Sequence, residues 1–172
     1  MTFPGSVLYT TAQRLFCDVV GVPVYKVHYL ASFATFRGYL VHGEIPTLRS
    51  AFLICLGPLF VNTVVGAVLS FPAILPWFFL ENEALSGETQ ILLWLGMSCG
   101  MQALPRDEDI QHFLFQTATA HRSGLLVFLA RCFSIFMRVV NFLRRLWLDA
   151  FYAILTSIAV PWLVVRTFVT TP

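Results

Sequence analysis

The chain has 172 residues, which is enough for one domain, and it is unusually apolar. Hydrophobic residues make up 58% of it and charged residues 12%, against ~25% charged residues in a typical soluble domain. This composition excludes an ordinary soluble domain with a polar shell and predicts an integral membrane protein in contact with lipids. The net charge of +2 is small, so we expect no nucleic-acid partner.

Residues 4–20 are predicted to form the first helix, which ends before Gly21. Its middle carries a polar patch made of Tyr9, Thr10 and Gln13. The spacing of these residues is that of the zinc motif H-E-x-x-H, in which two histidines lie one helical turn apart and the glutamate activates water. None of those three motif residues is present at these positions.

Two short segments after the first helix have the pattern of strands. Residues 22–30 alternate apolar and polar side chains and are rich in β-branched and aromatic types, and residues 38–42 form a second such run. Together they predict a β-hairpin over about residues 22–42. We expect it at the membrane interface or covered by protein, because bare strand edges are not tolerated in hydrocarbon.

Three apolar segments are predicted to be membrane helices: residues 48–70, 90–104 and 146–165. The first is expected to break or kink at the prolines that follow residue 70. The second is short and contains small residues that allow another helix to approach closely. These helix-packing residues are Gly96, Ser98 and Gly100.

Residues 107–143 are predicted to form amphipathic, interfacial helices. Arg131 and Arg138 are seven residues apart and Arg145 follows, so the three lie near one stripe of a helix. We expect this stripe to contact lipid head groups, with substrate binding as the alternative. Whether residues 124–143 span the membrane or lie at its surface stays open at this point.

The predicted architecture is therefore a single, mainly α-helical membrane domain over residues 1–172, with about three to five membrane helices and one interfacial hairpin. Its orientation is predicted by the distribution of basic residues. The basic regions 14–49 and 106–145 are expected on the cytoplasmic side, and the acidic loop 81–89 on the opposite side.

The order of several short motifs resembles small membrane-embedded metalloproteases related to the site-2 protease family. The resemblance covers roughly residues 4–150, and its motifs are moderately specific because five of them occur in the same order. In chain order they are Pro4-Gly5, Leu15-Phe16-Cys17-Asp18-x-x-Gly21-Val22-x-Val24, Gly38-Tyr39-x-x-His42, Gly57-Pro58-Leu59-Phe60-Val61-Asn62-Thr63 and Ala103-Leu104-Pro105-x-x-x-Asp109.

The resemblance implies a vestigial metal site. The family's H-E-x-x-H falls on Tyr9, Thr10 and Gln13, its third metal ligand on Asp109, and a position that is commonly histidine on Gln102. Both imidazoles and the general base are therefore missing. One carboxylate cannot hold zinc, which needs about three ligands, and a threonine hydroxyl cannot act as a base near neutral pH.

These observations lead us to expect a catalytically inactive relative of the family that binds no metal or cofactor. It would serve as a structural or accessory subunit together with other membrane proteins, and its former cleft would be lined by the vestigial residues and Asn62. Two alternatives stay open. One is a membrane protein that binds a lipid or a small molecule, and the other is an active metalloprotease with unconventional ligands.

Overall fold

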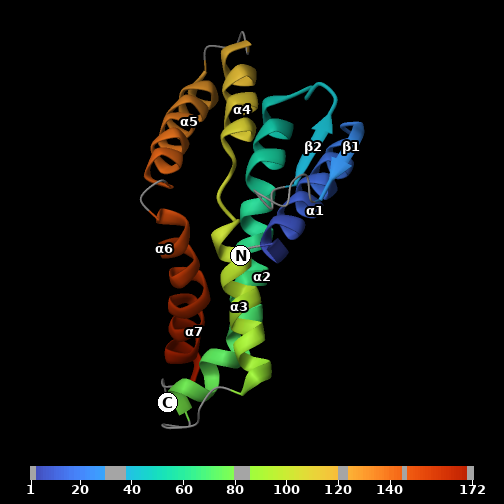
Figure 1. Cartoon of the computed structure of the whole chain (residues 1–172). Helices are drawn as coiled ribbons and strands as arrows, with labels where there is room; N and C mark the ends of the chain where they lie inside the picture. Colours follow the sequence, from blue (N-terminus) through green and yellow to red (C-terminus); the bar gives the residue numbers. More distant parts are fainter. Residues whose placement is uncertain (1–2, 30–37, 80–85, 120–123, 145–146, 170–172) are drawn as a thin grey trace.

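A computed structural model describes residues 3–29, 38–79, 86–119, 124–144 and 147–169. It confirms a mainly helical chain with one small antiparallel sheet (Figure 1). The elements in chain order are α1 (Phe3–Val20), β1 (Val24–His28), β2 (Tyr39–His42), α2 (Leu48–Phe79), α3 (Gly87–Met101), α4 (Asp107–Thr119), α5 (Leu125–Arg144), α6 (Leu148–Ile154), the π-helix η1 (Leu155–Ala159) and α7 (Val160–Val169).

Helix α2 is the long axis of the molecule, and α1, α3, α4, η1 and α7 pack against it (Figure 1). Of the two outcomes expected after residue 70, the helix does not break but bends, because α2 continues for 32 residues with Pro58, Pro72 and Pro76 inside it. A proline removes one backbone hydrogen bond and bends a helix, but it does not have to end it when neighbouring helices hold both halves. Figure 1 accordingly shows the last turns of α2 bending away from α3.

Helix α3 runs antiparallel to α2, and small residues let their backbones approach closely (Figure 1). A Cβ atom added to Gly96 would lie 2.6 Å from the carbonyl oxygen of Gly66 and 2.0 Å from the Ser70 hydroxyl. A Cβ atom added to Gly100 would lie 2.8 Å from the Cα of Ala153 in α6. The predicted small-residue face is therefore used inside the chain and is not free for another subunit.

The hairpin packs beside α1, and its strands are shorter than predicted (Figure 1). Leu30 and the residues up to 37 lie outside the described part of the chain. The strands pair with Val27 opposite Leu40 and His28 opposite Tyr39, and the last two rings stack at 4.8 Å. Cross-strand aromatic contacts of this kind stabilise a short ribbon that has few backbone hydrogen bonds.

The C-terminal segment differs from the single predicted helix over 146–165. It forms α6, a five-residue π-helix and α7, with Pro161 in the first turn of α7. A proline lacks the N–H that an α-helix needs at that position, and a π-helical turn is one way in which a continuous helix accommodates the loss. The chain therefore continues down the side of α2 instead of ending at Pro161.

Among the residues that the structure describes, two helical segments are long and apolar enough to cross a membrane: Leu48–Pro76 and Leu148–Thr167. A core helix of a soluble protein can also meet this criterion, but such a helix is mostly buried. Here the buried share of the apolar window is 39% in the first segment and 28% in the second. Neither apolar window is therefore mostly buried inside the chain.

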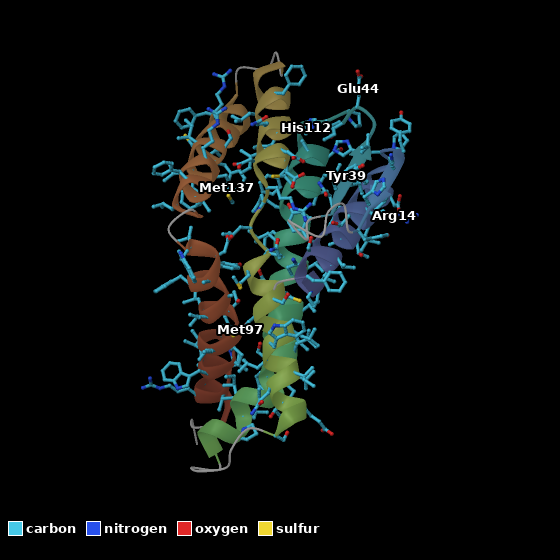
Figure 2. All side chains as sticks on the ribbon, viewed as in Figure 1. Arg14, Tyr39, Glu44, Met97, His112 and Met137 are labelled. Carbon is cyan, nitrogen blue, oxygen red and sulfur yellow. The ribbon has the colours of Figure 1, made fainter. Side chains whose placement is uncertain are left out.

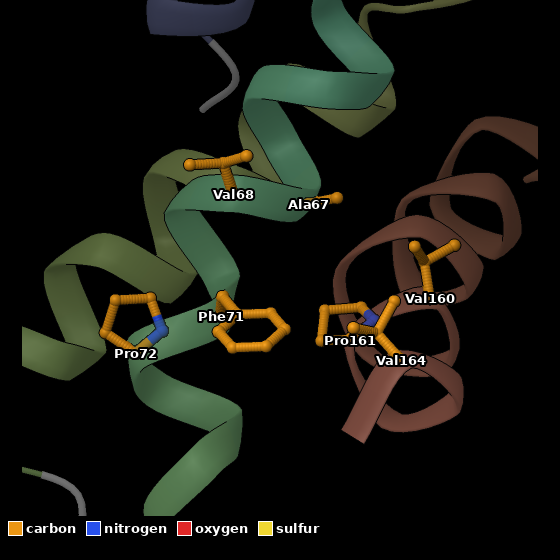
Figure 3. Close-up of a pocket in the computed structure, with 7 residues that line it drawn as sticks. All are labelled: Ala67, Val68, Phe71, Pro72, Val160, Pro161 and Val164. Carbon is orange, nitrogen blue, oxygen red and sulfur yellow. The ribbon is translucent and has the colours of Figure 1, made fainter. Parts of the chain in front are cut away.

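An apolar cavity of about 440 Å³ separates the lower half of α2 from α7 (Figure 3). Both prolines that bend these helices, Pro72 and Pro161, lie in its walls. Its full lining is Ala67, Val68, Phe71, Pro72, Val160, Pro161 and Val164.

The close packing of α2 on α3 gives a first testable prediction. Gly96→Ala should lower the free energy of unfolding by about 1–3 kcal/mol, because the added methyl group forces backbones apart. The matched control is Gly87→Ala in the first turn of the same helix, where an added Cβ meets no atom within 4 Å. Thermal unfolding of both variants in detergent measures the difference, and an equal melting temperature for the two would contradict the packing described.

Candidate functional site

The predicted polar residues of α1 meet Asp109, which lies in the first turn of α4. The Tyr9 hydroxyl donates a hydrogen bond to Oδ2 of Asp109 at 2.6 Å. The Gln13 side-chain amide donates to Oδ1 of the same carboxylate, also at 2.6 Å. One turn of α1 therefore presents two donors that engage both oxygens of a residue about 100 positions further along the chain.

Burial fixes the proton arrangement of this contact. Tyr9 is fully buried and Gln13 is 4% exposed. Burial, and to a smaller extent the negative charge of Asp109, raises the pKa of Tyr9 well above its usual value of 10.0. The phenol therefore stays protonated near neutral pH and acts as the donor, with the carboxylate as the acceptor.

Arg106 extends this contact to the hairpin. Its guanidinium lies 4.4 Å from the centre of the Tyr9 ring, a cation–π arrangement. The same group donates to the carbonyl oxygen of Gly38, at the start of the second strand, and to the Ser6 hydroxyl at 3.4 Å. Ser6 also accepts a hydrogen bond from the Gly38 amide at 3.1 Å. These bonds join α1, the hairpin and the start of α4.

Asn62 ties α2 to the same region. Its side-chain amide donates to the carbonyl oxygens of Gly5 at 3.3 Å and Gln102 at 3.2 Å. Asn62 is fully buried, and its Oδ1 atom has no hydrogen-bond partner among the described residues. Gln102 takes part in this bond through its main chain.

The structure places the six predicted site residues in three groups. Tyr9 and Gln13 each donate a hydrogen bond to Asp109, and Asn62 donates to the backbone carbonyl of Gln102. Thr10 is buried and donates to the Ser6 carbonyl within its own helix at 3.0 Å. The donors to Asp109 are therefore the side-chain amide of Gln13 and the hydroxyl of Tyr9.

The sequence motifs did not indicate three residues of this site, Arg106, His42 and His112. Arg106 was treated only as a charge for topology, although its position three residues before Asp109 places both at one helix start. His42 and His112 were not expected to meet, yet their ring centres are 5.6 Å apart. These histidines and Asp109 border a cavity of about 10 Å³, close to the smallest volume that holds one water molecule.

The site contains three donor groups, a phenol, a carboxamide and a guanidinium, and one acceptor, a carboxylate with both oxygens engaged. In the described part of the chain, no three His, Cys, Asp or Glu side chains are grouped in a way that could hold a metal ion. The arrangement can therefore hold elements together and bind polar groups through hydrogen bonds.

The predicted arginine stripe lies on a different element, α5. Arg131 and Arg138 are both exposed there, and Arg145 falls outside the described residues.

Comparison of the chain with protein-family models, curated proteins and solved structures finds no match. The functional argument therefore depends on the geometry above and on the motifs in the sequence.

The contact at Asp109 gives a second prediction. Asp109→Ala should destabilise the fold by about 2–5 kcal/mol, because it leaves the buried Tyr9 hydroxyl and Gln13 amide without their acceptor. Tyr9→Phe removes only one donor and should cost about 1–2 kcal/mol. In the double variant the two losses should not add, since both act on the same bond. Thermal or chemical unfolding in detergent measures all three, and full additivity would show that the bond does not form.

Proposed function

We propose that this chain is a catalytically inactive membrane protein on a site-2-protease-like frame, which serves as a structural or accessory subunit of a larger membrane complex. The observation that carries the proposal is the hydrogen-bonded set of Tyr9, Gln13 and Asp109. These are the positions at which the family resemblance places the metal ligands. The set joins α1 to α4 directly, where a metal ion would otherwise join them.

The chemistry of these residues favours a structural role over hydrolysis. Zinc hydrolysis needs nitrogen, sulfur or carboxylate ligands and an open position for water. Here a phenol and an amide point their donors at the carboxylate, and both of its oxygens are engaged. Thr10 stands where the resemblance places the general base, and its hydroxyl bonds to the carbonyl of Ser6 in the same helix.

The exposed apolar side chains of the two candidate spans support the membrane location. Val64 and Val68 on α2 are 61% and 64% exposed, and Leu163 on α7 is 58% exposed. Apolar side chains exposed to water contribute no hydrophobic stabilisation. Contact with hydrocarbon or with another apolar protein surface removes them from water. We propose that lipids and neighbouring membrane subunits contact these side chains.

The arrangement along α2 supports the predicted orientation. The hairpin, α4 and α5 lie near the Leu48 end of α2, and the start of α3 lies near the other end (Figure 1). On this proposal the basic regions 14–49 and 106–145 are cytoplasmic, and the acidic loop 81–89 is on the opposite side. Labelling of single cysteines at Lys26 and at Glu88 with an impermeant reagent checks this: the two sites should react from opposite sides, and a cytoplasmic Glu88 site contradicts it.

A lipid-binding membrane protein is the second candidate, and the apolar cavity between α2 and α7 favours it (Figure 3). Its walls belong to the two candidate spans, so in a bilayer it would open toward acyl chains. This role is compatible with a structural subunit, because bound lipids commonly fill gaps between membrane helices.

Restoring the missing ligands tests the proposed frame. Tyr9→His with Gln13→His places two imidazoles one turn apart beside Asp109, and this set should bind about one zinc ion per chain. The wild-type chain should bind only substoichiometric zinc. The control is the same double variant with Asp109→Ala, which should lose the metal. Metal analysis of the purified proteins measures all three, and a double variant that binds no zinc contradicts the frame.

The subunit role is tested by the size of the native assembly. The chain has a mass of 19.4 kDa, so a complex in mild detergent should show a clearly larger protein mass by light scattering. The wild type should co-purify with other membrane proteins in fixed proportion. A monomer that carries no partner from its native membrane would remove the support for an accessory role.

A further inference from the structure

Helix α5 has one side that packs against the rest of the chain and one that does not. Ser134 and Met137 are buried, and Phe133 lies edge-to-face with Phe113 of α4 at 5.9 Å. Figure 2 shows Met137 on this helix beside α4. These residues follow helical spacing, so they define the inward side of α5.

The outward side of α5 is apolar and contiguous. Phe128, Ile135, Val139 and Phe142 recur at intervals of seven, four and three residues, which places them on one face of the helix. They are 63%, 61%, 52% and 69% exposed. A soluble monomer rarely exposes a contiguous apolar face of this size to water, so we expect this side of α5 to contact lipid or another apolar surface.

Two arginines form one edge of that outward face. Arg131 and Arg138 are both exposed and lie seven residues apart. Neither guanidinium contacts a carboxylate in the described part of the chain, and α5 itself contains no acidic residue. An apolar face bordered by cations complements a layer of anionic head groups above acyl chains, and guanidinium groups bind phosphate through paired hydrogen bonds.

We propose that the outward side of α5 binds anionic phospholipids of the surrounding bilayer: Arg131 and Arg138 hold the phosphate groups, and the apolar face contacts the acyl chains. This inference rests on the proposed membrane location. The chain itself supports it, because the candidate span Leu148–Thr167 begins four residues after the end of α5. A symmetric pair of α5 helices fits less well, since it would bring arginines of like charge together.

A spin label on Cys132 tests whether bilayer covers this face. Cys132 is exposed on α5, whereas Cys17, Cys55 and Cys99 are buried, so the label attaches selectively. In nanodiscs of phosphatidylcholine and phosphatidylglycerol, the label should collide more with oxygen, which concentrates in the bilayer, than with a water-soluble nickel chelate. The control label is on Glu44→Cys in a Cys132→Ser background, at an exposed residue just after the hairpin that should prefer nickel.

The arginines are tested by the lipid that stays bound. Native mass spectrometry should show that Arg131→Gln with Arg138→Gln retains less phosphatidylglycerol, by about fivefold for each arginine removed. Arg131→Lys with Arg138→Lys keeps the charge and should retain most of the lipid. The matched control is Arg14→Gln with Arg49→Gln, two exposed arginines on other helices, which should behave as wild type.

Three results would overturn the inference. The Cys132 label could respond to nickel as the Glu44 label does, it could be shielded from both reagents as under a protein partner, or lipid retention could be unchanged in the glutamine variant. Each of these results contradicts only the proposed role of α5, provided that the chain is still retained in nanodiscs. A chain that is not retained in nanodiscs at all would instead contradict the proposed membrane location.

Discussion

The structure depends on the two hydrogen bonds that Asp109 accepts from α1. Tyr9 and Gln13 are buried polar side chains, and a buried donor without an acceptor destabilises a fold by about 1–3 kcal/mol. Asp109 satisfies both at once and therefore fixes the start of α4 against the middle of α1. Arg106, three residues earlier, stacks on the Tyr9 ring and bonds to Gly38. The position of the hairpin thus follows from the same contact.

The second constraint is the close approach of two helix backbones, those of α2 and α3. Gly66 and Gly96 allow α2 and α3 to touch, while Ser98 on the next part of α3 accepts a hydrogen bond from the Gly5 amide at 3.1 Å. At these points helix α3 contacts α1 and α2 through small residues. Such contacts give little hydrophobic driving force, and they suit helices that pack in lipid, where van der Waals fit and hydrogen bonds dominate.

Sequence patterns could predict the helices and strands, but not whether a helix continues through a proline. Periodicity locates the helices and the hairpin, because alternation and apolar length are local properties. The prolines left open whether a helix breaks or bends, since the continuity of the helices at Pro72 and Pro161 depends on their neighbours. In the site, spacing selected Tyr9 and Gln13, and the resemblance added Asp109. The role of Arg106 was not predictable, because its acceptor is the backbone of a distant residue, Gly38.

The same three residue positions can be held together by a metal ion or by hydrogen bonds to a carboxylate. The two arrangements differ in whether they must leave a position open to water. A catalytic metal site must keep one position open to water and must hold a base nearby. A carboxylate with both oxygens engaged has no such requirement, and a protonated phenol over which an arginine stacks closes the space further. On the proposed function, hydrogen-bond donors therefore stand where the family has metal ligands, and the site is packed instead of open to water. The surfaces left for interaction are then the outward faces of α2, α5 and α7, where exposed apolar side chains are concentrated.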